Sequence, residues 1–249
     1  MHMILAEAQP LAVHYVPIAT TVISAVFCGV LVARYIRKGW RGPHLLWWAV
    51  GVFFYGLGTA LESTITLAGN SIALNKAWYI AGAILGGYPL AQGTVYLLLK
   101  RRTAHVLSAC SLPLVVIASV LVIASPAIPE NLEPHRPSGA VLAWRWVRLL
   151  TPLINGYAAL FLIGGAVLSA WRFARKAATG HRAIGNALIA LGALLPGIGG
   201  GMAKGGIVEG LYVGEFLGIL LIWAGYAFCV RRPSAKEPDA PTAVVTAER

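Results

Sequence analysis

The chain has 249 residues, of which 58% are hydrophobic and only 12% are charged, and its formal net charge is +11. Soluble domains typically carry about 25% charged residues. A mean hydropathy of +0.72 therefore excludes a soluble globular fold, because the surface of such a fold needs polar groups. The basic residues stand in short clusters between apolar runs. This pattern is typical of membrane topology signals and does not indicate nucleic-acid binding.

Seven apolar segments are long enough to cross a bilayer, since a membrane-spanning helix needs about 20 mostly apolar residues. We therefore predict an all-α, polytopic membrane protein, with a bundle of seven transmembrane helices within residues 1–232. Residues 233–249 are polar and contain proline, which predicts a disordered tail. The predicted spans are 13–36, 44–68, 76–99, 105–125, 146–171, 183–204 and 211–230.

The distribution of Lys and Arg predicts the orientation of the bundle. Of the 20 basic residues, 15 follow the first, third, fifth and seventh predicted spans. Cytoplasmic loops are enriched in Lys and Arg, so we expect the N-terminus outside and the C-terminus in the cytoplasm, with the protein in the inner (plasma) membrane. The longest outer loop, 126–143, contains several prolines and charged residues, which exclude a further span there.

Acidic residues within two predicted spans are the first candidates for function, because ionisable groups in a bilayer are costly and often functional. Glu62 shares one helical face with Trp48 and Tyr55, and Glu215 shares one with Trp223, at spacings of three and four residues. Glu62 either lines a pocket or is a structural carboxylate paired inside the bundle, and Glu215 either lines a pocket or points into the outer headgroups. The predicted ligand-binding residues are Tyr55, Glu62, Tyr88, Gln92, Arg148, Asn155, Lys204, Glu215 and Trp223.

The depth of these residues predicts an outward-facing polar pocket with an aromatic floor. The acids and most of the polar candidates fall in the outer third of the bilayer, and the aromatic residues lie further in. We expect Glu62 to face the bundle interior and to pair with Lys204 or Arg148, because pairing reduces the cost of burying a charge.

A glycine stripe in the sixth predicted span has two interpretations. Gly197, Gly201 and Gly205 are spaced by four residues, and such a stripe lets a neighbouring helix approach closely. The same glycines, together with Pro196, would alternatively break the helix and open its backbone to a cavity.

The sequence offers no local signature of catalysis or of a cofactor. The three cysteines form no CxxC, and no two histidines within a span are three or four residues apart. Zinc and haem sites are therefore not supported. We assign no catalytic and no metal-binding residue, and the cofactor is unknown.

One stretch of the chain resembles a known sensor region. The segment LLWWAVGVFFYGLGTALEST, then Lys76 and Trp78, and a third span that ends in LLLKRR are similar to the seven-helix N-terminal sensor region of bacterial histidine kinases. The resemblance implies a membrane sensing or ligand-binding module. The sequence contains no kinase domain, so we expect a separate signalling partner. The architecture is also similar to that of microbial rhodopsins, but the last span lacks the lysine that attaches retinal.

We therefore expect a ligand-binding or sensor-like membrane protein with no chemistry of its own. Its expected partners are the lipid bilayer, a small apolar or amphipathic ligand, and a signalling protein or a second copy of the chain. Two alternatives remain open. One is a small-molecule or ion transporter or channel, gated by the outer charged groups. The other is a membrane enzyme that acts on a lipid-like substrate and uses Glu62 as acid or base.

Overall fold

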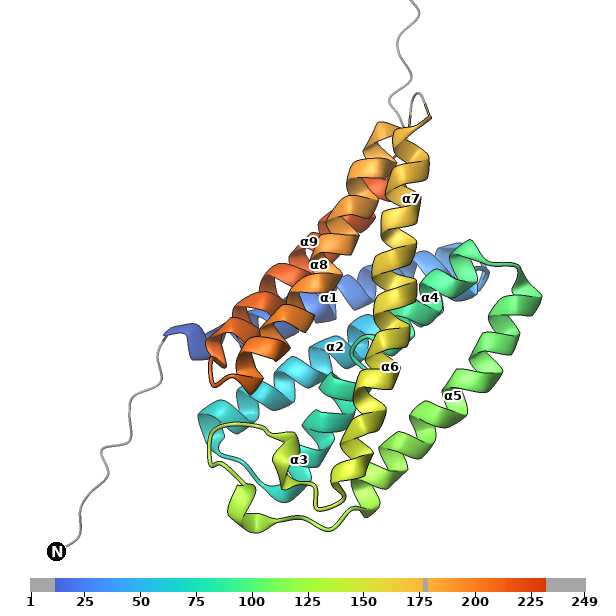
Figure 1. The fold of residues 1–249 in the computed structure, drawn as a ribbon. Helices are drawn as coiled ribbons and strands as arrows, with labels where there is room; N and C mark the ends of the chain where they lie inside the picture. The colour runs from blue at the N-terminus through green and yellow to red at the C-terminus, as the bar shows by residue number, and fades with distance from the viewer. Residues whose placement is uncertain (1–11, 177–178, 232–249) are drawn as a thin grey trace, which may run out of the picture.

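The computed structural model describes residues 12–176 and 179–231, except for the Lys204 side chain, and it is all-α (Figure 1). The predicted tail, 233–249, lies outside the described residues. Six of the described segments are long and apolar enough to cross a membrane, so the chain is a multi-pass membrane protein. They are Ala12–Arg37 (η1, Ala12–Tyr15, then α1, Val16–Arg37), Pro43–Ala68 (α2), Arg101–Ala124 (α5), Arg145–Ala174, Gly180–Ala203 (in α8, Gly180–Lys204) and Glu209–Val230 (α9).

The third predicted span, 76–99, is not one continuous helix, so it is not among the six candidate spans. It is divided into α3 (Ile72–Trp78), the π-helical segment η2 (Tyr79–Ile84) and α4 (Tyr88–Leu98). Pro89 lies in the first turn of α4 and has no backbone N–H with which to continue the preceding helix. The break therefore occurs at the turn just before α4.

The fifth predicted span contains a second π-helical segment, although the helix runs on through it. Its parts are η5 (Arg145–Leu149), α6 (Leu150–Ala158), η6 (Ala159–Gly164) and α7 (Gly165–Ala174). A π-helical turn inserts one extra residue into a helix and rotates the faces on either side of it. The faces presented by α6 and α7 are therefore not related by simple 3.6-residue periodicity.

One end of the bundle, which we call the basic end, gathers basic residues from several helices. Arg34 of α1, His44 of α2 and Arg182 of α8 line one cavity, together with residues at the C-terminal ends of α4, α7 and α9. In Figure 1 these ends lie toward the top and right of the view, and α7 to α9 lean away from α4 there. Neighbouring spans thus run in opposite directions, as an up-and-down bundle requires.

The opposite end, which we call the loop end, is covered by the long loop between α5 and η5. The buried Asn75 side chain donates from Nδ2 to the Ser138 carbonyl (2.7 Å) and accepts at Oδ1 from the Ser138 N–H (2.9 Å). Lys76 Nζ donates to the carbonyls of Ile123 (2.8 Å) and Ser125 (2.6 Å). A cation at these carbonyls caps the C-terminal end of α5. The loop is thereby fixed to α3, and α3 to the end of α5.

Glycines spaced by seven residues hold α8 against α9. A Cβ added at Gly192 would lie 2.6 Å from the Gly218 carbonyl oxygen, and one at Gly185 would lie 2.6 Å from that of Gly225. Gly199 meets α9 in the same way, at the Gly210 carbonyl oxygen (2.7 Å). The two backbones therefore touch along the whole length of the pair, which only glycine permits.

The predicted glycine stripe does not form the contact between α8 and α9. A Cβ added at Gly197 or Gly201 would meet no described heavy atom within 4 Å, and α8 continues through Pro196 without a break. Both interpretations of the stripe at Gly197, Gly201 and Gly205 were therefore wrong. The helix contact follows a seven-residue repeat, as in antiparallel left-handed packing, and a four-residue repeat drifts away from it.

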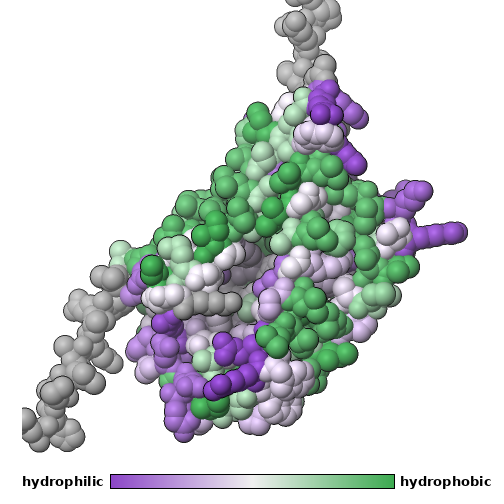
Figure 2. All heavy atoms as spheres, viewed as in Figure 1, coloured by the Kyte–Doolittle hydropathy of each residue, from purple (hydrophilic) through white to green (hydrophobic). Residues whose placement is uncertain are grey.

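The outer surface of the bundle suits a lipid environment. Hydrophobic side chains cover the sides of the helices and hydrophilic ones gather toward the ends (Figure 2). Large apolar side chains stand exposed on several helices, such as Val22 (57% exposed) and Leu160 (66%). In water such a surface would be unfavourable, and in a bilayer it faces acyl chains.

Candidate functional site

A cavity of about 390 Å³ opens at the basic end, between α1, α2 and α4 on one side and α7, α8 and α9 on the other. Pockets that bind small molecules typically enclose about 300–1,000 Å³. The cavity is therefore large enough for a ligand of moderate size. Its walls come from helices far apart in sequence, so it exists only in the assembled bundle.

The deep part of the cavity is apolar. Its floor is formed by side chains that are almost fully buried in the bundle, and these belong to the larger of two clusters of core residues. The hydroxyl of Thr94, which also lines the wall, donates to the Leu90 carbonyl of its own helix (3.2 Å) and so adds little polarity. The main floor residues are Phe27, Leu31, Leu45, Val52, Leu90 and Ile222.

The mouth of the cavity is cationic. Arg34, Lys38, His44 and Arg182 line it, and no acidic side chain is among the described residues of the wall. The Arg34 guanidinium lies 5.5 Å from the centre of the Tyr226 ring, a distance at which cation and ring attract one another. The mouth therefore presents positive charge above an apolar floor.

The predicted residues Tyr55, Glu62 and Glu215 meet in a different place, toward the loop end. Glu62 is 0% exposed, and its carboxyl lies close to the Glu215 carboxyl and to the Trp78 indole. The Tyr55 hydroxyl donates to the backbone carbonyl of Glu215 (2.7 Å). The expected partner Arg148 is exposed and forms no described ion pair with Glu62; the side chain of the other expected partner, Lys204, lies outside the described residues.

Gln92 and Tyr88 are buried but bonded to other side chains of the protein. Gln92 accepts from the Tyr157 hydroxyl (2.7 Å) and donates to Ser108 (2.5 Å), and the Tyr88 hydroxyl bonds to Ser111 (2.8 Å). These hydrogen bonds tie α4 to α5 and α6. The polar atoms of both residues thus stabilise helix packing in this structure.

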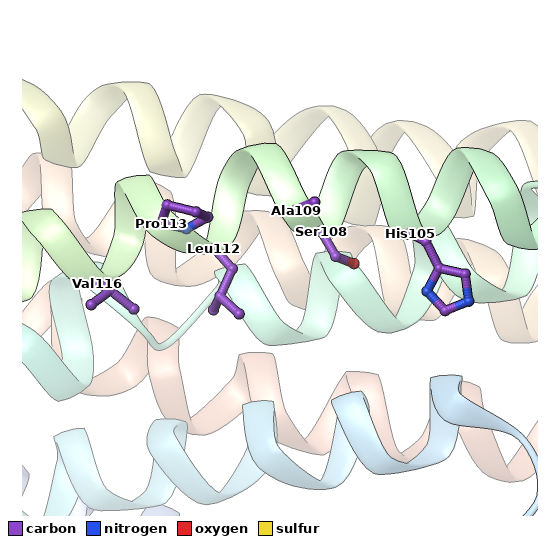
Figure 3. A pocket seen from close by; sticks show the side chains of 6 residues that line it. All are labelled: His105, Ser108, Ala109, Leu112, Pro113 and Val116. Carbon is purple, nitrogen blue, oxygen red and sulfur yellow. The ribbon is translucent and has the colours of Figure 1, made fainter.

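Ser108, which accepts the hydrogen bond from Gln92, also lines a shallow groove along α5, shown in Figure 3. His105, Ser108, Leu112 and Val116 point to one side of the helix there (Figure 3), and His105 Nδ1 lies 2.9 Å from the Tyr96 hydroxyl. The groove is open along a helix whose neighbouring apolar side chains are exposed. Lipid chains would fill such a groove in a bilayer.

The other predicted residues lie apart from both sites. Trp223 stacks on Phe27, with ring centroids 5.4 Å apart, and helps to join α9 to α1. Asn155 is exposed on α6. None of the eight predicted ligand-binding residues with a described side chain is among the residues that line the cavity, so the sequence reasoning missed the cavity.

The missed residues had been interpreted as topology signals. Arg34, Lys38 and Arg182 belong to the clusters that orient the protein, and His44 begins a helix. A signal was present for two of them, since Arg34 is followed directly by Tyr35 and Lys38 lies two residues before Trp40. That signal cannot show which helix ends converge.

The described residues contain no group of three or more His, Cys, Asp or Glu side chains placed to hold a metal ion. The geometry of the cavity supports binding, since its wall combines hydrocarbon surface with fixed positive charge. No protein-family model, no curated protein and no solved structure matches this chain.

Proposed function

We propose that the chain is a ligand-binding, sensor-like membrane protein that takes up an amphipathic anion of the fatty-acid class in the cavity at its basic end. In this proposal seven segments cross the plasma membrane, the N-terminus is outside, and the cavity opens toward the cytoplasm. The observation that supports it best is the combination of an apolar floor with a cationic mouth that has no described acidic side chain.

The energetics favour a ligand with one acidic head and one alkyl chain. Each methylene buried from water contributes about 0.8 kcal/mol, which the apolar floor can provide. A carboxylate at the mouth would meet Arg34 and Arg182, and hydrogen bonds between ionised groups contribute about 1.5–3 kcal/mol each. A neutral alcohol of equal length would gain only the first contribution, and an amine would be repelled.

The position of the cavity suggests how ligand binding is transmitted to a signalling partner. Its two walls belong to the helix groups α1, α2, α4 and α7, α8, α9, so an occupant contacts both groups at the end that we assign to the cytoplasm. Filling the cavity would fix the spacing of these helix ends. A signalling partner could respond to that spacing, as in the sensor regions that part of the sequence resembles.

Thermal unfolding of the purified protein in nanodiscs tests the proposal. We expect palmitate to raise Tm, because a ligand at 100 times its Kd stabilises the folded state by about 2.7 kcal/mol. Hexadecanol should raise Tm less and hexadecylamine should not raise it. Native mass spectrometry of the extracted protein should show a bound fatty acid.

A charge-matched pair of variants separates binding at the mouth from general attraction of anions. In R34A/R182A we expect palmitate affinity to fall at least about tenfold, as the loss of one charge-assisted hydrogen bond predicts. The control R101A/R102A removes two exposed basic residues at the start of α5 that do not line the cavity, and it should retain the affinity. Equal losses in the two variants would contradict the proposal.

A further inference from the structure

The carboxyl groups of Glu62 and Glu215 face each other inside the bundle. Each lies more than one helical turn from the end of its helix at the loop end, where α2 finishes and α9 begins. Both oxygens of Glu62 and Oε2 of Glu215 are buried, and none of them has a hydrogen-bond partner among the described residues. Glu62 interacts with Glu215 across the contact between the two helices. Buried polar atoms nearly always have a partner, so this pair lacks a component.

The packing around the pair fixes its position. A Cβ added at Gly58 would lie 2.9 Å from the Gly82 Cα, so α2 touches η2 backbone to backbone. One turn beyond Gly58 on α2 is Glu62, and one turn before Gly82 is Trp78, which places the indole beside the carboxyl. The backbone that carries Glu62 is therefore held against the segment that carries Trp78.

Two hydrogen bonds join α2 to α9 on either side of the pair. Tyr55 donates to the Glu215 carbonyl (2.7 Å) toward the basic end, and Thr66 bonds to the Tyr212 hydroxyl (2.9 Å) toward the loop end. Helices α2 and α9 are thus held together at the depth where both carry a carboxyl group. Two ionised carboxylates at this contact would repel one another and would each lose their hydration.

The groups facing the pair do not supply a neutralising cation among the described side chains. The ion pair among the described residues is Glu133–Arg136 (3.8 Å), which lies in the loop. Lys76 is bonded to carbonyls at the end of α5. Glu209 faces Tyr212 from α9.

Histidines and an arginine approach from the loop end. The His14 ring packs on Tyr212 (centroids 6.2 Å apart), and His135 Nδ1 lies 3.1 Å from the Thr66 carbonyl. Arg136 donates to the Ala203 carbonyl (2.6 Å) at the end of α8.

We propose that Glu62 and Glu215 form a proton-binding site, in which one proton is held between the two carboxyl groups at neutral pH. A proton needs no cavity, supplies the missing hydrogen bond and removes one of the two charges. The proton comes from water and returns to it, so no other reactant is required. This site is separate from the cavity and does not depend on the ligand proposed for it.

Infrared difference spectroscopy at varied pH tests this site directly. The chain has only nine Asp and Glu residues, and of these Glu62, Glu209 and Glu215 lie in the described membrane-crossing helices. We expect wild-type protein at pH 7 to show the carbonyl stretch of a protonated carboxyl group, sensitive to deuterium and lost at high pH. The band should be absent in E62Q/E215Q and displaced in each single variant, because an amide replaces one carboxyl partner.

The control E130Q changes an exposed acid in the loop and should leave the band in place. Glutamine is neutral and of similar shape, so the variants should fold; the wild-type spectrum tests the site even if one does not. The proposal is overturned if wild-type protein lacks the band at pH 7 or if E62Q/E215Q retains it. It is also overturned if sodium or calcium ions abolish the band at constant pH, since the pair would then be a metal-ion site.

Discussion

At the scale of single residues, some buried polar side chains of this protein have hydrogen-bond partners and others have none among the described residues. Asn75 and Gln92 find their partners across helix or loop contacts, and their role is to hold neighbouring elements in place. Glu62 has no such partner among the described residues. This contrast is why we assign a binding role to the acid and a structural role to the amides.

The structural role of Asn75 can be measured. Asn75→Ala would leave the N–H and the carbonyl of Ser138 without their partners, and an unsatisfied buried group costs about 1–3 kcal/mol. We expect a corresponding loss in the free energy of unfolding, measured by denaturant titration in detergent. Asn155→Ala, at an exposed position of α6, is the matched control and should change stability by less than about 0.5 kcal/mol.

Helical periodicity was enough to predict the direction in which many of these residues point. Glu62 and Tyr55, which spacing placed on one face of α2, are both buried. The partners could not be predicted, because they depend on which helices are neighbours and on their relative register. The expected pairing of Glu62 with Arg148 fails for this reason.

At the scale of elements, the α8–α9 pair is defined by glycines that the sequence analysis had passed over. The four-residue stripe matches a known packing motif, but the helix contact is made by Gly185, Gly192 and Gly199. A seven-residue repeat of single glycines is hard to recognise in a chain that contains 28 glycines. The break before α4 had a visible signal in Pro89, although 76–99 was predicted as a single span.

This difference between glycines gives a paired test. Gly192→Ala places a methyl group against backbone atoms of α9 that cannot move independently, and overpacking of this kind costs about 1–3 kcal/mol. We expect a lower Tm in detergent for this variant. Gly201→Ala meets no described atom and should leave Tm unchanged or slightly raised; a greater loss at Gly201 than at Gly192 would contradict the assigned contact.

At the scale of the whole molecule, composition and length determine most of what could be predicted. Six of the seven predicted spans agree with the candidate membrane-crossing helices to within a few residues. Basic residues of two clusters, Arg34 with Lys38 and Arg182, meet at one end of the bundle. The cavity could not be predicted, because it is formed by the convergence of six helices. Its lining residues carry no motif that sets them apart from ordinary helix ends.

The proposed orientation can be tested by labelling in intact cells. In a background without Cys28, Cys110 and Cys229, a cysteine in place of Glu130 should react with a membrane-impermeant maleimide from outside. Cysteines in place of Thr103 or Thr179 should react only after the cells are opened. The reverse pattern would place the basic end outside and would reverse the proposed topology.

The close contact of α8 with α9 also has a consequence for biosynthesis. Only residues 205–208 separate the two helices, so the pair can form as a hairpin as soon as it leaves the ribosome, without waiting for distant segments. This hairpin follows the other described helices in the chain, yet it docks on α1 and α2 through Trp223 on Phe27 and Glu215 on Tyr55. The cavity and the acid pair both need residues of α9, so neither can form before that helix has been made.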